Sequence, residues 1–83
     1  MKPYKDKNNI REFSKNINSN KLIWHKDKNN RLVEVLEGKG WKFQLDNELP
    51  FELKENNIIF IPKDKIHRLI KGNTNLKIKI EEQ

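Results

Sequence analysis

The spacing of apolar residues near the start of the chain predicts a short helix. Ile10, Phe13 and Ile17 follow one another at intervals of three and four residues, which is the period of one helix face. Asn9 precedes them and is suited to cap the first turn. We therefore expect a helix over residues 10–17, with a mobile polar arm before it.

From residue 21 onward, short apolar runs alternate with turn residues. The expected strands cover residues 22–24, 32–36, 41–45, 49–53, 58–61, 66–70 and 76–80, with the run at 58–61 buried on both faces. No helical pattern separates them, which argues against a parallel α/β sheet. The prediction is an all-β fold, a small barrel or jelly roll over residues 21–83, preceded by an arm and helix over residues 1–20.

Composition limits how much core this fold can build. The chain has 83 residues, of which 34% are hydrophobic and 36% are charged, so we expect one domain with a small core. A second copy would bury apolar surface that one chain cannot cover, and exposed edge strands favour pairing, so we expect a homodimer. The absence of cysteine excludes disulfides, thiolate metal sites and cysteine nucleophiles.

The net charge of +6 suggests a nucleic-acid partner at first sight. Only three of the basic residues are arginines, and the lysines are dispersed among glutamates and many asparagines, which indicates a compositional bias. Nucleic acid is therefore not the expected partner. The longest apolar run, residues 58–61, is too short to cross a bilayer, and the N-terminus lacks a secretory pattern. We expect a soluble cytoplasmic protein with no membrane contact.

Two spaced sets of residues resemble the two motifs of the cupin superfamily, G-x5-H-x-H-x3,4-E-x6-G and G-x5-P-x-G-x2-H-x3-N. The first set is His25-x-Asp27-x3-Arg31-x6-Gly38. The second set is Asn56-x5-Pro62-x-Asp64-x2-His67. The resemblance covers residues 23–80 and implies a small cupin-type barrel.

The chain departs from these motifs at several positions. Asn56 and Asp64 stand where the second motif has glycine, and both residue types tolerate left-handed backbone geometry, so the turns can be kept. Lys71 stands where that motif ends in asparagine.

The resemblance also implies where a metal would bind. The four ligand positions of metal-binding cupins fall on His25, Asp27, Arg31 and His67. Arginine stays protonated and cannot ligate a cation. We expect Arg31 to pair with Asp27, to remove it from the ligand set and to make the pocket attractive to anions.

Three functional hypotheses follow. The first is a cupin-like domain that binds a small polar or anionic molecule without a conventional metal centre, through His25, Asp27, Arg31, Gln44 and His67. The second is a metal-binding, enzymatic cupin that uses His25, Asp27 and His67 for a divalent transition metal. The third is a non-catalytic interaction module with a basic surface.

Each of these residues also has an ordinary structural interpretation, such as a half-buried histidine or an ion pair on a solvated strand. Gln44 is expected to face either the barrel or water. The argument for a site is that polar groups converge in an apolar barrel, which is typical of a small-ligand pocket. Some cupins isomerise sugars without a metal, so the resemblance leaves catalysis open.

Overall fold

The computed structural model describes residues 4–83 and shows an all-β chain, which confirms the predicted class. Its elements are β1 (Lys5–Lys7), β2 (Ile10–Phe13), a 3-10 turn η1 (Ser19–Lys21), β3 (Arg31–Glu37), β4 (Lys42–Leu45), β5 (Phe51–Glu52), β6 (Ile58–Ile61), β7 (His67–Ile70) and β8 (Leu76–Glu82). None of the helices in this part of the chain is long and apolar enough to cross a membrane.

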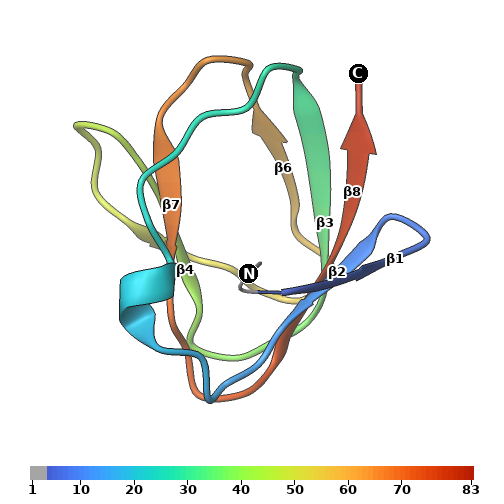
Figure 1. The fold of residues 1–83 in the computed structure, drawn as a ribbon, viewed down its shortest axis with the longest axis vertical. Helices are drawn as coiled ribbons and strands as arrows, with labels where there is room; N and C mark the ends of the chain where they lie inside the picture. The colour runs from blue at the N-terminus through green and yellow to red at the C-terminus, as the bar shows by residue number, and fades with distance from the viewer. Residues whose placement is uncertain (1–3) are drawn as a thin grey trace.

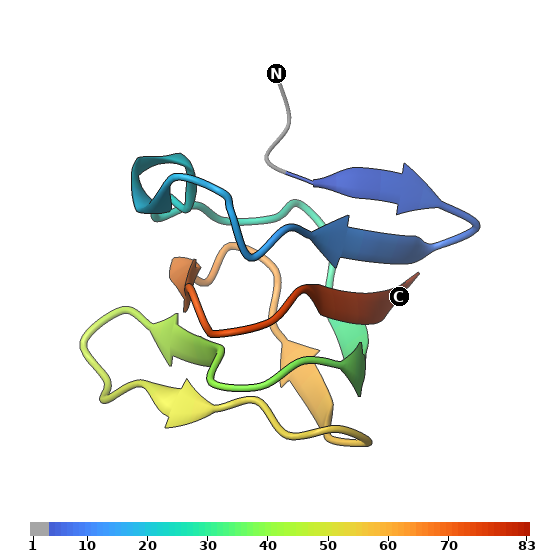
Figure 2. The ribbon, with the colours of Figure 1, turned by 90° about the horizontal axis from the view of Figure 1, so that it is seen from below.

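The strands form two antiparallel sheets that face each other (Figures 1 and 2). The larger sheet has the order β1-β2-β8-β3-β6, and the smaller sheet has the order β5-β4-β7. Of the two predicted forms, barrel or jelly roll, the barrel is wrong, because the sheets do not close and end at separate edges. At one such edge β5 is only two residues long and follows Pro50, which has no N–H to donate to a further strand.

The predicted N-terminal helix is also wrong, because residues 10–13 form a strand that pairs with β8. Asn8 and Asn9 both have positive φ, of 52° and 67°, and they join β1 to β2 as a two-residue hairpin turn. Such a turn requires positive φ at both central positions, which favours asparagine. The apparent cap is therefore a hairpin turn. The expected mobile arm contains β1, and its first three residues lie outside the described part.

The segment before β3 is less regular than expected. Residues 22–24 do not form a strand, and the 3-10 turn η1 precedes them. The Asn18 side chain caps this turn by accepting a hydrogen bond from the Asn20 N–H at 2.9 Å. Local capping therefore competes with strand pairing here.

The later strands agree better with the prediction. The runs at 32–36, 41–45, 66–70 and 76–80 all coincide with strands, whereas the run at 49–53 is strand only over Phe51–Glu52. The prediction that 58–61 is buried on both faces is wrong, because Ile58 and Phe60 are 70% and 52% exposed. β6 is an edge strand and has one face in solvent.

The core lies between the sheets, and nine hydrophobic side chains of residues 4–83 are buried in it. They are Phe13, Val33, Val35, Trp41, Phe43, Leu53, Ile61, Leu76 and Ile78. Trp41 is fully buried, and its indole N–H donates to the Thr74 carbonyl at 2.6 Å. Trp24 is 41% exposed and has the Arg68 guanidinium over its ring.

Candidate functional site: a His-Asp-His cluster in a cavity between the sheets

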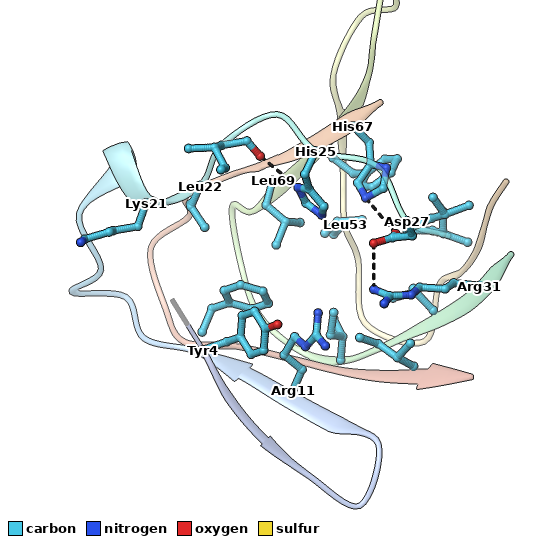
Figure 3. Close-up of a pocket in the computed structure, with 18 of the residues that line it drawn as sticks. Tyr4, Arg11, Lys21, Leu22, His25, Asp27, Arg31, Leu53, His67 and Leu69 are labelled. Atoms are coloured by element: carbon cyan, nitrogen blue, oxygen red, sulfur yellow. Dashed lines mark hydrogen bonds and ion pairs between the residues drawn. The ribbon is translucent and has the colours of Figure 1, made fainter. Parts of the chain in front are cut away.

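A cavity of about 450 Å³ lies between the two sheets. Its walls are mostly apolar side chains from both sheets, while His25, Asp27, Arg31 and His67 gather at one end (Figure 3). Four of the five predicted site residues are therefore brought together. The fifth is described below.

The two histidines are held together by their backbones and their rings. The N–H of each residue donates to the carbonyl of the other, at 3.0 Å and 2.8 Å, in an isolated bridge between the segment before β3 and β7. Their ring centroids lie 4.4 Å apart, and the Phe43 ring stacks on His67 with the centroids 5.4 Å apart. His25 is exposed at the edge of the cavity, whereas His67 is buried.

Backbone carbonyls determine which ring nitrogens remain available. Nδ1 of His25 lies 3.0 Å from the Ile23 carbonyl, and Nδ1 of His67 lies 2.8 Å from the Lys65 carbonyl. A carbonyl only accepts, so Nδ1 carries the proton in both rings. When each ring is neutral, Nε2 is therefore a free acceptor. This is the usual second-shell arrangement of histidines that ligate a metal through Nε2.

Burial favours the neutral form of His67. Removal from water lowers the pKa of His67, the hydrogen bond to the Lys65 carbonyl raises it, and the neighbouring His25 lowers it again. Asp27 raises this pKa and Arg31 lowers it, as the smaller influences. At neutral pH the His67 Nε2 lone pair is therefore available.

Asp27 is anchored by the turn between β6 and β7. Its carbonyl accepts a hydrogen bond from the Asp64 N–H at 2.8 Å, and Asp64 has a φ of 62°. Asp64 thus adopts the left-handed geometry expected at a glycine position of the cupin motif, and so does Asn56, with a φ of 73°. The Asp27 side chain is only 9% exposed.

The two oxygens of Asp27 have different environments. Oδ1 lies 3.3 Å from Nη1 of Arg31, and Oδ2 lies 3.4 Å from Nε2 of His67. Oδ2 is buried and has no hydrogen-bond partner. The expected pairing with Arg31 is present, but it uses one oxygen and leaves the other directed at the histidine.

Arg31 reaches the cavity because it begins β3 and shares a face with Val33, which also lines the cavity. Its Nη2 donates to Glu82 of β8 at 3.1 Å, opposite Arg31 in the sheet register. Its Nε is buried without a hydrogen-bond partner. The Arg31–Asp27 pair is largely buried, in contrast to the alternative of a solvated surface pair.

Together, one ligand atom from each of His25, Asp27 and His67 lies within 4.8 Å of the others. Ligand atoms of a tetrahedral metal lie about 3.4 Å apart when each bond is about 2.1 Å long, so the most widely spaced of these atoms would need to approach by at most about 1.4 Å. The cluster is thus close to ligating separation. Two imidazoles and a carboxylate form a set that suits iron, zinc and similar divalent ions.

Gln44 lies away from this cluster. Its side-chain oxygen accepts from Nε of Arg68 at 2.9 Å, and its amide nitrogen donates to the Glu48 carbonyl at 2.9 Å. These contacts belong to the smaller sheet and its hairpin, and Gln44 does not line the cavity.

Four cavity residues come from residues 1–20, the region expected to be arm and helix. They are Tyr4, Arg11, Phe13 and Asn20. The Arg11 guanidinium carbon lies 3.8 Å from the centre of the Tyr4 ring. The adjacent asparagines at 8 and 9 were the signal for a hairpin, which places Arg11 and Phe13 on one face of β2.

The fold is similar to a solved structure, protein NMB1881 from Neisseria meningitidis. The likeness has a TM-score of 0.62, at 15% sequence identity, and covers 96% of this chain and 80% of that one. At this identity the similarity concerns the fold alone. No protein-family model and no curated protein matches the sequence.

Proposed function

We propose that this protein binds a divalent transition metal through His25, Asp27 and His67 and holds a small anionic molecule beside it in the cavity. The observation that supports the proposal best is the buried Oδ2 of Asp27, which has no hydrogen-bond partner and faces the Nε2 of His67 at 3.4 Å. With His67 neutral, two acceptors face each other. A cation between them would satisfy both.

The surroundings of the cluster fit this role. Both histidines are oriented by backbone carbonyls, and Phe43 packs against the His67 ring, so little reorganisation is needed on binding. His25 is exposed, which gives an ion a route from solvent. A metal bound here would supply a Lewis acid at the polar end of an apolar cavity.

Arg31 makes an anionic partner the expected one. Its charge beside the cluster disfavours a lone cation, because like charges repel most strongly where little water screens them. An anion bound at the same end would compensate for that repulsion. The apolar walls would then receive the rest of a small organic acid.

Metal binding can be measured directly on the purified, chelator-treated protein. Titration with Co²⁺, followed by its visible absorption spectrum, reports binding and ligand type, and calorimetry with Zn²⁺ gives the affinity. We expect one equivalent to bind, and His25→Ala, Asp27→Ala and His67→Ala each to abolish it.

Gln44→Ala is the matched control, because Gln44 is polar and belongs to β4 but lies outside the cavity. It should bind metal like the wild-type chain. Failure of the wild-type protein to bind Co²⁺ or Zn²⁺ at neutral pH, both alone and with added acetate, would refute the metal proposal.

A metal-free anion site is the second candidate, and the unpartnered Nε of Arg31 favours it. In this case Arg31 and the two histidines would hold a carboxylate or phosphate directly. The test is a thermal-shift screen with short mono- and dicarboxylates and inorganic phosphate in the presence of a chelator. Stabilisation that Arg31→Ala removes would support this candidate, and no stabilisation by any of these anions would exclude it.

A further inference from the structure

The four outer edges of the two sheets differ in how they are protected from other chains. β1 has the sequence Lys-Asp-Lys, and charged residues discourage edge pairing. β5 is short and follows Pro50. β7 is covered at His67 by the bridge to His25. β6 (Ile58–Ile61) contains no charged residue, and its flanking proline, Pro62, comes only after the strand ends.

β6 presents apolar side chains and free backbone groups at the same residues. Its one partner among the described strands is β3. The Val35 N–H donates to the Asn57 carbonyl at 2.9 Å, and in an antiparallel ladder such groups recur at every second residue. Ile59 and Ile61 therefore bond toward β3, and Ile58 and Phe60 direct their N–H and C=O groups to the open edge.

We infer that β6 pairs with β6 of a second copy, antiparallel across a two-fold axis at Ile59. This register places Ile58 opposite Phe60 of the partner subunit, and the same contact recurs on the other side of the axis. All the edge-facing backbone groups of Ile58 and Phe60 would then be hydrogen-bonded. Centring on Phe60 instead would set Ile58 opposite a proline, which has no N–H.

Side chains and charges fit the same register. Leu32 lies beside Phe60 in the sheet, so apolar residues from β3 and β6 of both copies would form one patch across the joined sheets. In the flanking turns, Glu55 would come near Lys63 of the partner subunit, and Lys54 near Asp64 of the partner subunit. Each contact pairs opposite charges and occurs twice.

The oligomeric state tests the inference. Sedimentation of the wild-type chain at high micromolar concentration should give a dimer, and Ile58→Lys and Phe60→Lys should each give a folded monomer. Leu49→Lys is the control, because Leu49 is an 88% exposed hydrophobic residue that lies outside β6. A wild-type monomer, a dimer that survives both β6 variants, or a dimer lost in Leu49→Lys would overturn the inference.

A cysteine variant tests the register without introducing charge. The chain has no cysteine, so Ile59→Cys can link only to its own copy. Non-hydrogen-bonded antiparallel pairs have Cα atoms about 4.5 Å apart, which a disulfide can span. Ile59→Cys should therefore form a covalent dimer under mild oxidation, well ahead of Phe60→Cys. The reverse order would refute the register, and the result does not depend on metal binding, because it is read in chelator.

Discussion

Two arginines line the same cavity, and each is paired with an aspartate, but the two pairs differ. Arg11 meets Asp6 through Nε at 3.4 Å and Nη2 at 3.0 Å, so both carboxylate oxygens are engaged. Arg31 meets only Oδ1 of Asp27, and Oδ2 is left facing His67. The Asp6 side chain is 38% exposed and that of Asp27 is 9% exposed.

The difference shows which end of the cavity is suited to chemistry. The Arg11–Asp6 pair is satisfied by its own fork geometry and by water, so it needs no further partner. At the other end, a buried oxygen without a partner costs free energy that a bound cation or proton would recover. The two pairs contain the same residue types. Burial and the neighbouring histidine make Asp27, and not Asp6, a candidate metal ligand.

The largest expected effect on stability comes from the core residue Trp41, whose aromatic neighbours lead to Tyr4 beside Arg11. Trp41 is fully buried and packs on Phe13, which in turn packs on Tyr4. Trp41→Ala should lower the free energy of unfolding by about 3–5 kcal/mol, as expected for deleting a buried aromatic side chain. Urea denaturation followed by circular dichroism measures it.

Trp24→Ala is the matched control, because this tryptophan is 41% exposed and stacks only on Arg68 among the ring contacts described. It should cost about 0.5–1 kcal/mol, the scale of an exposed cation–π contact. Equal losses for the two variants would contradict the assignment of Trp41 to the core.

The sequence predicted a strand correctly where the alternation of apolar and polar residues within that segment was enough to identify it. Alternation at 41–45 and 76–80 identified strands, because each of these strands has one face in the core. Residues 10–17 were assigned to a helix because the three apolar residues Ile10, Phe13 and Ile17 fit a helix face as well as a strand followed by a turn. Pairing with β8, a contact across more than sixty residues, decides the outcome, and it cannot be read locally.

The candidate site was predicted for the residues whose spacing matched a motif. His25, Asp27, Arg31 and His67 meet because the turn at Asp64 and the bridge to β7 bring the two motifs together. The sequence also predicted the Arg31–Asp27 pair, but not that a single oxygen would be used. The orientation of side chains within a cluster depends on packing. The sequence therefore could not predict which Asp27 oxygen contacts Arg31, or that Gln44 lies outside the cavity.

The next largest effect is expected on metal affinity in Asp27→Asn. This variant tests whether the unpartnered carboxylate oxygen of Asp27 is a metal ligand. Loss of a second-shell partner alone weakens metal binding about 10–100-fold, so loss of a direct carboxylate ligand should weaken it by more than about 100-fold. Asp6→Asn removes the equivalent carboxylate at the Arg11 end and should leave Co²⁺ binding unchanged. The comparison fails if the two variants lose metal affinity equally.

Arg31→Ala should change metal and anion binding in opposite directions. It removes a positive charge beside Asp27, so Zn²⁺ affinity measured without added anion should rise. Binding of a carboxylate or phosphate should weaken by about 1.5–3 kcal/mol, the scale of a charge-assisted hydrogen bond. Arg68→Ala, which lies outside the cavity, should alter neither. Unchanged anion affinity in Arg31→Ala would show that Arg31 serves the fold alone.

The smallest effect is expected from the Arg11–Asp6 pair itself. Its carboxylate is 38% exposed, so water and salt already screen the charge, and exposed ion pairs contribute only about 0–1 kcal/mol. Asp6→Asn should therefore lower the free energy of unfolding by no more than about 1 kcal/mol. The difference from the wild-type chain should shrink further in urea denaturation at high salt. A larger loss that persists at high salt would mean that this pair is as protected from water as the Arg31 pair, and the contrast between the two ends of the cavity would no longer rest on burial.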